Sequence, residues 1–154
     1  MLRRFVELAD AGLILEKSDE VDLTDLVKTV SQSTIPEDIT FEIDQLPVVR
    51  CDRLKAGQTF QNLFENALTH GKPRKIEVRM QTIEDSTRIL IANDGAQIPH
   101  ENRSKIFNRR FTTKKGGSGL GLAIVQKLVR GHGWKISLAD TPETSFMIQI
   151  PEEP

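Results

Sequence analysis

The chain has 154 residues, enough for one domain with a hydrophobic core and too few for two. With 21 Lys and Arg against 22 Asp and Glu, the formal net charge is −1, so no overall basic field would hold a nucleic acid or an anionic membrane. The hydrophobic share of 38% fits a globular domain, and no apolar stretch approaches the roughly 20 residues that span a bilayer. The single Cys51 excludes an internal disulfide and suits a reducing compartment. We expect a cytoplasmic location, which leaves open whether a longer parent protein is attached to a membrane.

The first predicted element is a helix over residues 1–17, whose apolar residues follow helical spacing. No capping residue precedes it, so it is either the tail of a longer helix from a larger protein or a frayed terminal helix. Asp22 is suited to cap a second helix over residues 23–33, and Pro36 closes that region.

The middle and end of the chain mix strands with helices. Short β-rich runs at residues 39–43 and 47–51 precede a helix that Asp52 is suited to cap, running to about Thr69. A hairpin follows, with strands at 76–80 and 87–92, and a glycine-rich loop leads into a helix from about 120 to 130. Residues 134–139 and 144–150 form a closing hairpin. This order predicts an α+β fold, with helices layered on a mostly antiparallel sheet.

The helix over residues 52–69 carries an unusual polar face. Asn62, Asn66, Thr69 and His70 lie away from the apolar stripe, although Asn disfavours helix interiors. Two amide oxygens one turn apart are able to share a hydrated Mg²⁺ and its phosphates, because Mg²⁺ takes oxygen ligands. The alternative is an ordinary solvated face.

Two loops carry further candidate chemistry. Residues 93–99 follow a strand and would place a polar oxygen where a purine amino group needs an acceptor, although Asn-Asp-Gly is also a common turn. Residues 112–124 combine glycines, two lysines and a helix start, which favours a phosphate cradle. This segment matches neither the Walker A loop nor the dinucleotide fingerprint. A flexible linker is the alternative, but linkers do not normally run straight into an apolar helix.

Taken together, these segments resemble the ATP-binding catalytic domain of sensor histidine kinases, in the Bergerat-fold group shared with gyrase, Hsp90 and MutL. The matching segments are residues 60–67 (N box), 93–99 (G1 box), 106–114 (F box) and 117–122 (G2 box). The resemblance covers about residues 20 to 151. It implies a two-layer α/β sandwich whose mobile ATP lid lies between Pro99 and Leu120.

The resemblance also implies roles for residues, with ATP and Mg²⁺ as cofactors. Asn66 would be the Mg²⁺ ligand, Asn62 would support the metal and phosphates, and Lys114 would meet the γ-phosphate. Phe107 and Phe111 would hold the base of the lid. The implied nucleotide-binding residues are Asn62, Asn66, His70, Asn93, Asp94, Gly95, Ile98, Phe107, Thr113, Lys114, Gly117, Ser118, Gly119, Leu120 and Gly121.

Two departures from the family pattern affect what is expected. Asn93 stands where the family has an Asp that accepts from the adenine amino group, and Gln97 replaces a Gly, so the base contact falls to Asn93 or, if the loop shifts, to Asp94. Asn62 stands where hydrolytic relatives carry a Glu, and an amide is not a useful general base. The sequence therefore favours phosphoryl transfer to a protein, with Glu65 kept only as a candidate helper.

The phosphoacceptor of the family has no counterpart here. His70, His100 and His132 lack the expected motif, and His132 between glycines is suited to cap a helix end. We expect residues 1–19 to be the tail of a preceding dimerisation and phosphoacceptor helix, and residues 20–154 to form the catalytic domain. The acceptor would be a His on a separate domain of the same or a partner chain, with a response regulator downstream.

We therefore predict a protein-histidine kinase domain that binds Mg-ATP without phosphorylating itself, and that contacts neither nucleic acid nor membrane. Two alternatives stay open. One is a hydrolytic ATPase of the same fold. The other is a nucleotide- or protein-binding module without catalysis, such as an anti-sigma-like or degenerate kinase.

Overall fold

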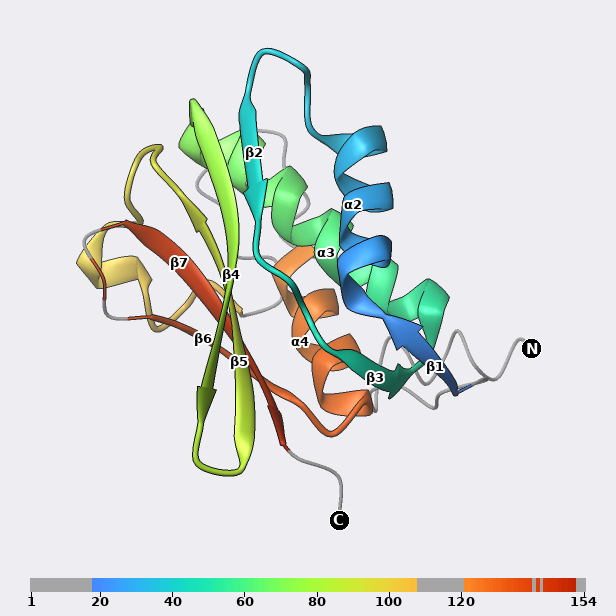
Figure 1. Ribbon diagram of the computed structural model, residues 1–154. Coiled ribbons are helices and arrows are strands. Elements are labelled where there is room, and N and C mark those ends of the chain that lie inside the picture. The colour runs from blue at the N-terminus through green and yellow to red at the C-terminus, as the bar shows by residue number, and fades with distance from the viewer. Residues whose placement is uncertain (1–17, 108–120, 140, 142, 152–154) are drawn as a thin grey trace, which may run out of the picture.

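The computed structural model describes residues 18–107, 121–139, 141 and 143–151. The helix expected over residues 1–17 and most of the expected lid lie outside this range. Within it, helices cover one face of a sheet whose strand order is β2-β4-β5-β7-β6 (Figure 1). Its strands are β2 (Thr40–Ile43), β4 (Lys75–Ile83), β5 (Ser86–Asn93), β6 (Lys135–Leu138) and β7 (Thr144–Pro151).

Only β2 and β4 pair in parallel, and every other pairing in this sheet is antiparallel. The predicted α+β class with a mostly antiparallel sheet is therefore confirmed. Both predicted hairpins are present as β4–β5 and β6–β7. The turn of the first hairpin places Glu84 at a φ of 51°.

The helices are α2 (Leu23–Thr34), α3 (Arg53–Asn66) and α4 (Gly121–Gly131), with a short 3₁₀ turn η2 (His100–Asn102). The two predicted caps are confirmed. The Asp22 carboxylate accepts from the N–H of Thr24 at 2.9 Å, and the Asp52 carboxylate accepts from that of Lys55 at 3.2 Å. Each cap satisfies an N–H that has no partner within its own helix.

Two elements differ from the expectation. Strand β1 (Asp19–Asp22) pairs antiparallel with β3 (Val48–Cys51), although its sequence is almost entirely charged. Only Val21 of β1 is fully buried, so no run of apolar residues predicts this strand from the sequence. The helix expected to reach Thr69 changes type after Asn66, because residues 67–71 form a π-helical turn, η1 (Ala67–Gly71).

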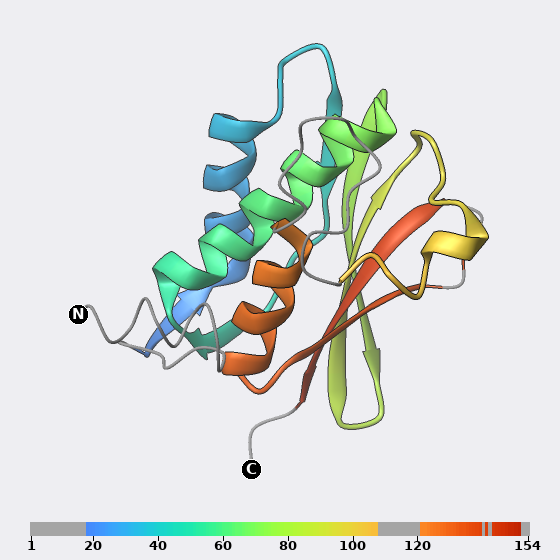
Figure 2. The same cartoon turned by 180° about the vertical axis from the view of Figure 1, so that it is seen from behind.

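Helix α3 is the central helix of the layer and lies between α2 and α4 (Figure 2). Its predicted apolar stripe is confirmed, since Phe60, Leu63 and Phe64 are completely buried. They belong to the same core as the inward-facing Ile76 of β4 and Ile89 of β5. Burying each large apolar side chain contributes roughly 1.5–3 kcal/mol, so this stripe fixes the rotation of α3 about its axis. The polar face of α3 is thereby held away from the sheet.

Within the described ranges, no helix is both long and apolar enough to cross a bilayer.

Candidate functional site

The end of the π-helical turn and the loop after β5 meet through their backbones. The N–H of Ala96 donates to the carbonyl of Gly71 at 2.8 Å. A Cβ placed on Gly95 would lie 2.0 Å from the same carbonyl oxygen, and one on Gly71 would lie 2.8 Å from Oδ1 of Asn93. Only glycine allows backbones to approach this closely. The junction therefore brings the segment after Asn66 against the loop that contains residues 93–98.

The π-helical turn sets how the chain leaves α3. The N–H of Ala67 is shared between the carbonyls of Leu63 and Phe64, and the turn ends at Lys72 with a left-handed φ of 48°. Single π turns are rare and are found frequently at functional sites. Here the wide turn follows directly after Asn66, the residue expected to bind the metal.

Asn62 and Asn66 lie one turn apart on α3 and both are half-buried. Among the described residues, no group of three or more His, Cys, Asp or Glu side chains is placed to hold a metal ion. A cation at this helix face would therefore take amide oxygens from the protein and further oxygens from a ligand or water. That donor set fits Mg²⁺, which prefers oxygen and keeps several waters or phosphates.

Asn93 ends β5 as a buried residue, 4% exposed. Its Oδ1 accepts from the N–H of Gly95 at 2.9 Å. The next residue points elsewhere, because Oδ1 of the exposed Asp94 accepts from the N–H groups of Arg74 at 2.8 Å and Lys75 at 3.0 Å. These two hydrogen bonds hold the pKa of the Asp94 carboxyl below its usual value. Asp94 thus fastens the loop to the start of β4.

The segment after the loop is anchored on the core. Ile98 and Phe107 are half-buried against it, and Phe107 makes an edge-to-face contact with Phe146 of β7 at a centroid distance of 6.1 Å. Aromatic pairs in this geometry contribute beyond their buried area. Gly121 begins α4, and a Cβ placed there would meet no atom of the described residues within 4 Å.

The remaining predicted residues fall into two groups. His70 is exposed on the π turn, in the segment that Gly71 joins to the loop. The rest of the expected lid contacts lie outside the described residues, namely Phe111, Thr113, Lys114, Gly117, Ser118, Gly119 and Leu120.

His132 is confirmed as a helix cap. Its Nε2 accepts from the N–H of Asp52 at 3.1 Å, so Nδ1 carries the proton and donates to the carbonyl of Leu128 at 2.8 Å. Burial lowers the pKa of His132, which keeps the ring neutral. With both ring nitrogens engaged, this side chain holds the end of α4 to the start of α3.

Cys51 is the one thiol of the chain, and it is buried. Burial raises the pKa of its thiol to about 11. It therefore stays protonated near neutral pH and is not a candidate nucleophile.

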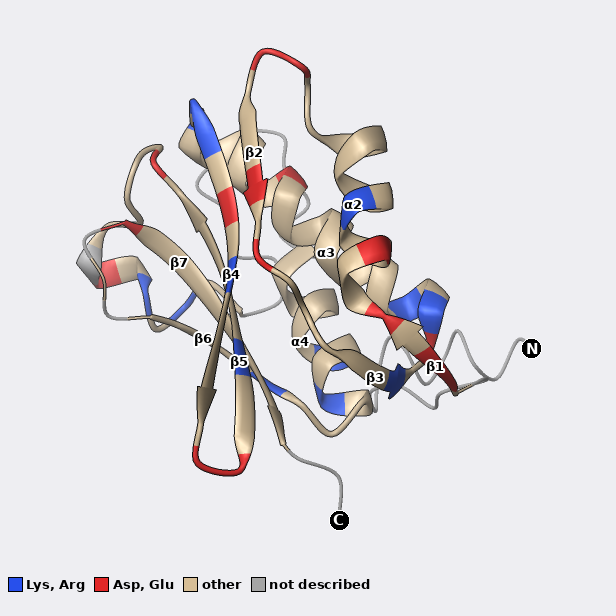
Figure 3. Cartoon of the chain, in the orientation of Figure 1, with Lys and Arg blue, Asp and Glu red and all other residues tan. Residues whose placement is uncertain are grey.

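Charge is distributed unevenly along the β4–β5 hairpin (Figure 3). Lys72, Arg74 and Lys75 gather at the start of β4, beside the glycine junction, whereas Glu84 and Asp85 form the opposite tip. The ammonium of Lys75 pairs with Glu42 at 2.8 Å, and this hydrogen bond raises the pKa of Lys75. Lys75 also pairs with Glu77 at 3.4 Å, so its charge is compensated and the positive charge at this end comes from Lys72 and Arg74.

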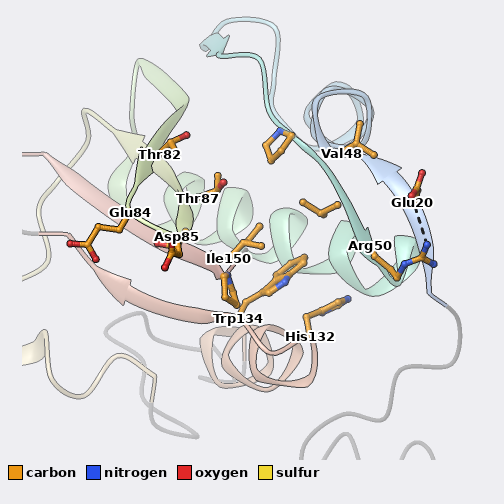
Figure 4. A pocket seen from close by; sticks show the side chains of 14 residues that line it. Glu20, Val48, Arg50, Thr82, Glu84, Asp85, Thr87, His132, Trp134 and Ile150 are labelled. Atoms are coloured by element: carbon orange, nitrogen blue, oxygen red, sulfur yellow. Dashed lines mark ion pairs between the residues drawn. The ribbon is translucent and has the colours of Figure 1, made fainter. Parts of the chain in front are cut away.

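A cavity of about 720 Å³ lies at the opposite end, between β3 and the hairpin tip (Figure 4). Among the described residues that line it, Arg50 is the one Lys or Arg, and it pairs with Glu20 at 3.7 Å. From Ser86 to Asn93 the strand rises roughly 23 Å, so the cavity is far from the junction. The lining residues include no predicted site residue; they are Glu20, Pro47, Val48, Val49, Arg50, Thr82, Glu84, Asp85, Ser86, Thr87, His132, Trp134, Ile150 and Pro151.

Sequence reasoning missed two parts of the site. Gly71 follows the predicted end of the helix near Thr69 and suggests no more than a helix stop, although its carbonyl forms the junction. The N–H groups of Arg74 and Lys75 were not considered, although they hold Asp94. The local signal for the first was a glycine placed directly after the polar helix face. The second leaves no signal, because every residue except proline carries a backbone N–H.

Known proteins share both the sequence and this arrangement. Residues 51–154 match the family of histidine kinase-, DNA gyrase B-, and HSP90-like ATPases. The alginate biosynthesis sensor protein KinB of Pseudomonas aeruginosa is 33% identical over an alignment of 132 residues that covers 79% of this chain and 22% of KinB. The chain thus spans about a fifth of that relative's length.

Solved structures of histidine kinases superpose on this fold. The catalytic domain of the histidine kinase ThkA superposes with a TM-score of 0.73 at 30% identity, covering 88% of this chain and 96% of that domain. ThkA in complex with the response regulator protein TrrA gives a TM-score of 0.70 at 28% identity, covering 89% of this chain and 42% of that one. The family match includes more than half of the chain, and the ThkA domain is matched over nearly its whole length. The chain therefore belongs to the histidine kinase-, DNA gyrase B-, and HSP90-like ATPase family, as an ATP-binding catalytic domain of the sensor histidine kinase type.

Proposed function

We propose that this domain binds Mg-ATP between the end of α3 and the loop over residues 93–98, and transfers its γ-phosphoryl group to a histidine on a separate domain. The observation that carries the proposal is the junction of Gly71 with Gly95 and Ala96. It joins the segment that follows Asn66 to the loop that begins at the buried Asn93. The basic start of β4 beside it suits a triphosphate.

Each group of residues has a distinct task in this proposal. Asn66, supported by Asn62, would hold Mg²⁺ together with phosphate oxygens, and Asn93 would contact the base. When bound, Mg²⁺ supplies charge neutralisation of the phosphates. Lys114 and the glycines of residues 117–121 would stabilise charge on the γ-phosphoryl group.

The transfer itself needs no covalent chemistry from this domain. An imidazole nitrogen of the acceptor His forms the new bond to phosphorus, the bond to the β–γ bridging oxygen breaks, and ADP leaves. Positioning and charge stabilisation supply the catalysis. We propose that the segment before β1, which begins at Asp19, continues from the domain that carries this His. A response regulator would then receive the phosphoryl group, in line with the complex formed by ThkA.

Calorimetric titration with an unhydrolysable ATP analogue, with and without Mg²⁺, tests the nucleotide site. We expect binding that Mg²⁺ strengthens, and loss of that gain in Asn66→Ala. Gln61→Ala is the matched control, because Gln61 is an exposed residue of the same helix and should leave binding unchanged. Absence of binding to the parent chain would contradict the proposal and favour an interaction module.

Incubation with γ-labelled ATP tests the destination of the phosphoryl group. We expect neither acid-labile label on this chain nor steady release of inorganic phosphate. Acid-labile label on the isolated chain would contradict the separate acceptor. Steady phosphate release that Glu65→Ala abolishes would instead favour a hydrolytic ATPase, because Glu65 is an exposed carboxylate next to Asn66.

A further inference from the structure

The carboxamide of Asn93 has its oxygen and nitrogen fixed by a neighbouring donor. The N–H of Gly95 donates to Oδ1 at 2.9 Å. The amide of Asn looks nearly symmetric, but a backbone N–H requires an acceptor, so the atom facing Gly95 has to be the oxygen. The close approach of Gly71, where a Cβ would lie 2.8 Å from this atom, encloses the oxygen between two backbone segments.

The other polar atom of the Asn93 side chain is Nδ2, which points away from the enclosed Oδ1. Among the described residues, Nδ2 donates no hydrogen bond. The one fully buried side-chain atom without a partner there is a nitrogen of Arg88, so Nδ2 is not such an atom. Within the part of the chain that the structure describes, Nδ2 is therefore the polar atom of this side chain that is open to a ligand. An amide nitrogen of this kind only donates.

We propose that Asn93 is a specificity-determining residue that donates a hydrogen bond to the purine base, so that the site accepts 6-oxopurine nucleotides. This inference rests on the proposed function, which places the base at Asn93. The C6 amino group of adenine is a donor, and two donors facing each other form no bond. The C6 oxygen of hypoxanthine or guanine is an acceptor and completes the hydrogen bond with Nδ2.

An aspartate at this position would act in the opposite sense. One carboxylate oxygen would keep the hydrogen bond to Gly95, and the second would replace Nδ2 with an acceptor. That acceptor matches the amino group of adenine and repels a 6-oxo group. The two side chains are nearly isosteric, so a single change of donor into acceptor decides the preference.

The neighbouring Asp94 does not compensate for Asn93. Its Oδ1 accepts from two backbone N–H groups at the start of β4, where it secures the loop. Shifting the loop by one residue to present Asp94 would break both of these bonds. It would also break the contact of Ala96 with Gly71.

The test compares ATP with inosine triphosphate, both with Mg²⁺, by calorimetric titration of the full chain. Inosine triphosphate has a 6-oxo group and lacks the additional amino group of guanine, so it isolates the contact at C6. We expect the parent chain to bind it at least as tightly as ATP. In Asn93→Asp, the ratio of the two dissociation constants should move by about tenfold or more in favour of ATP. The donor that pairs with the 6-oxo group is then replaced by a carboxylate oxygen that repels this group.

Asn102→Asp is the matched control, since it adds the same negative charge in the following 3₁₀ turn. A general charge effect acts equally on both triphosphates, so this variant should keep the parent's ratio. A parent chain that prefers ATP by about tenfold or more, or a ratio unmoved in Asn93→Asp, would overturn the inference while leaving the ATP site intact. Failure of both nucleotides to bind the parent would overturn the proposed function together with it.

Discussion

At the end of the β4–β5 hairpin that carries Asn93, two backbone segments touch without room for a side chain, whereas the opposite end borders a wide cavity. The first end carries Lys72 and Arg74 beside the ion-paired Lys75, and the second places Glu84 and Asp85 at the tip. The cavity beside this tip is therefore less suited to a nucleotide than the junction end is. In this fold, close backbone packing and charge locate the candidate site.

The largest expected effect comes from filling the glycine junction. Gly95→Ala would place a Cβ 2.0 Å from the carbonyl oxygen of Gly71, so one of the two segments has to move. We expect a loss of about 3 kcal/mol or more in unfolding free energy, together with loss of nucleotide binding. Chemical denaturation and calorimetric titration measure the two effects.

Gly57→Ala is the control for this prediction. A Cβ there would make an ordinary contact with Leu26 at 3.5 Å, and alanine is favoured over glycine inside a helix such as α3. We expect a gain of up to about 1 kcal/mol. If Gly95→Ala were as well tolerated as Gly57→Ala, the junction would not determine the site.

A smaller effect is expected at the cavity end, through His132. Its pKa is lowered mainly by burial, so the folded state binds its proton less readily than the unfolded chain does. Its contribution to stability is complete above about pH 6.5 and is lost as the pH falls below that value. Thermal unfolding between pH 7.5 and 5.5 should show a steeper loss in the parent than in His132→Gln. Equal slopes would refute the assigned hydrogen bonds, since His70 and His100 are common to both chains.

Asp94 should give a milder change at the junction end. Asp94→Ala removes the acceptor of two backbone N–H groups, a loss of about 1 kcal/mol by comparison with a helix cap. The lowered pKa means that the carboxylate stabilises the fold above about pH 4 and loses this role as the pH falls further. The stability difference between the parent and Asp94→Ala should therefore narrow in acid. A difference independent of pH would contradict the ionised contact.

The smallest effect concerns the hairpin tip, where Glu84 has a left-handed φ of 51°. Glu84→Gly relieves this strain but makes the unfolded chain more flexible, so we expect a stabilisation below about 1 kcal/mol. Nucleotide affinity should stay unchanged, which chemical denaturation and titration of the same sample can check. A change in affinity would mean that the two ends are coupled.

The features that the sequence predicted well are those decided by neighbouring residues. Asp22 and Asp52 cap the helices that follow them, and the α3 stripe is buried as its spacing indicates. The junction of Gly71 with Gly95 could not be predicted in this way, because it joins segments that meet only in the folded state. Strand β1 could not be predicted either, because its charged residues pair with β3, which is distant in the sequence. The role of Asn93 depends on which of its two polar atoms the fold occupies.

The aromatic pair at the cavity end has a practical consequence. Trp134 is the only tryptophan, the chain has no tyrosine, and the indole stacks on the ring of His132 at a centroid distance of 4.4 Å. Protonated imidazole quenches indole emission, so the intrinsic fluorescence of this protein is a single-site optical signal for the contact between α3 and α4. Loss of that contact in acid would be visible without any label, in the same cuvette in which a nucleotide is bound at the distant end.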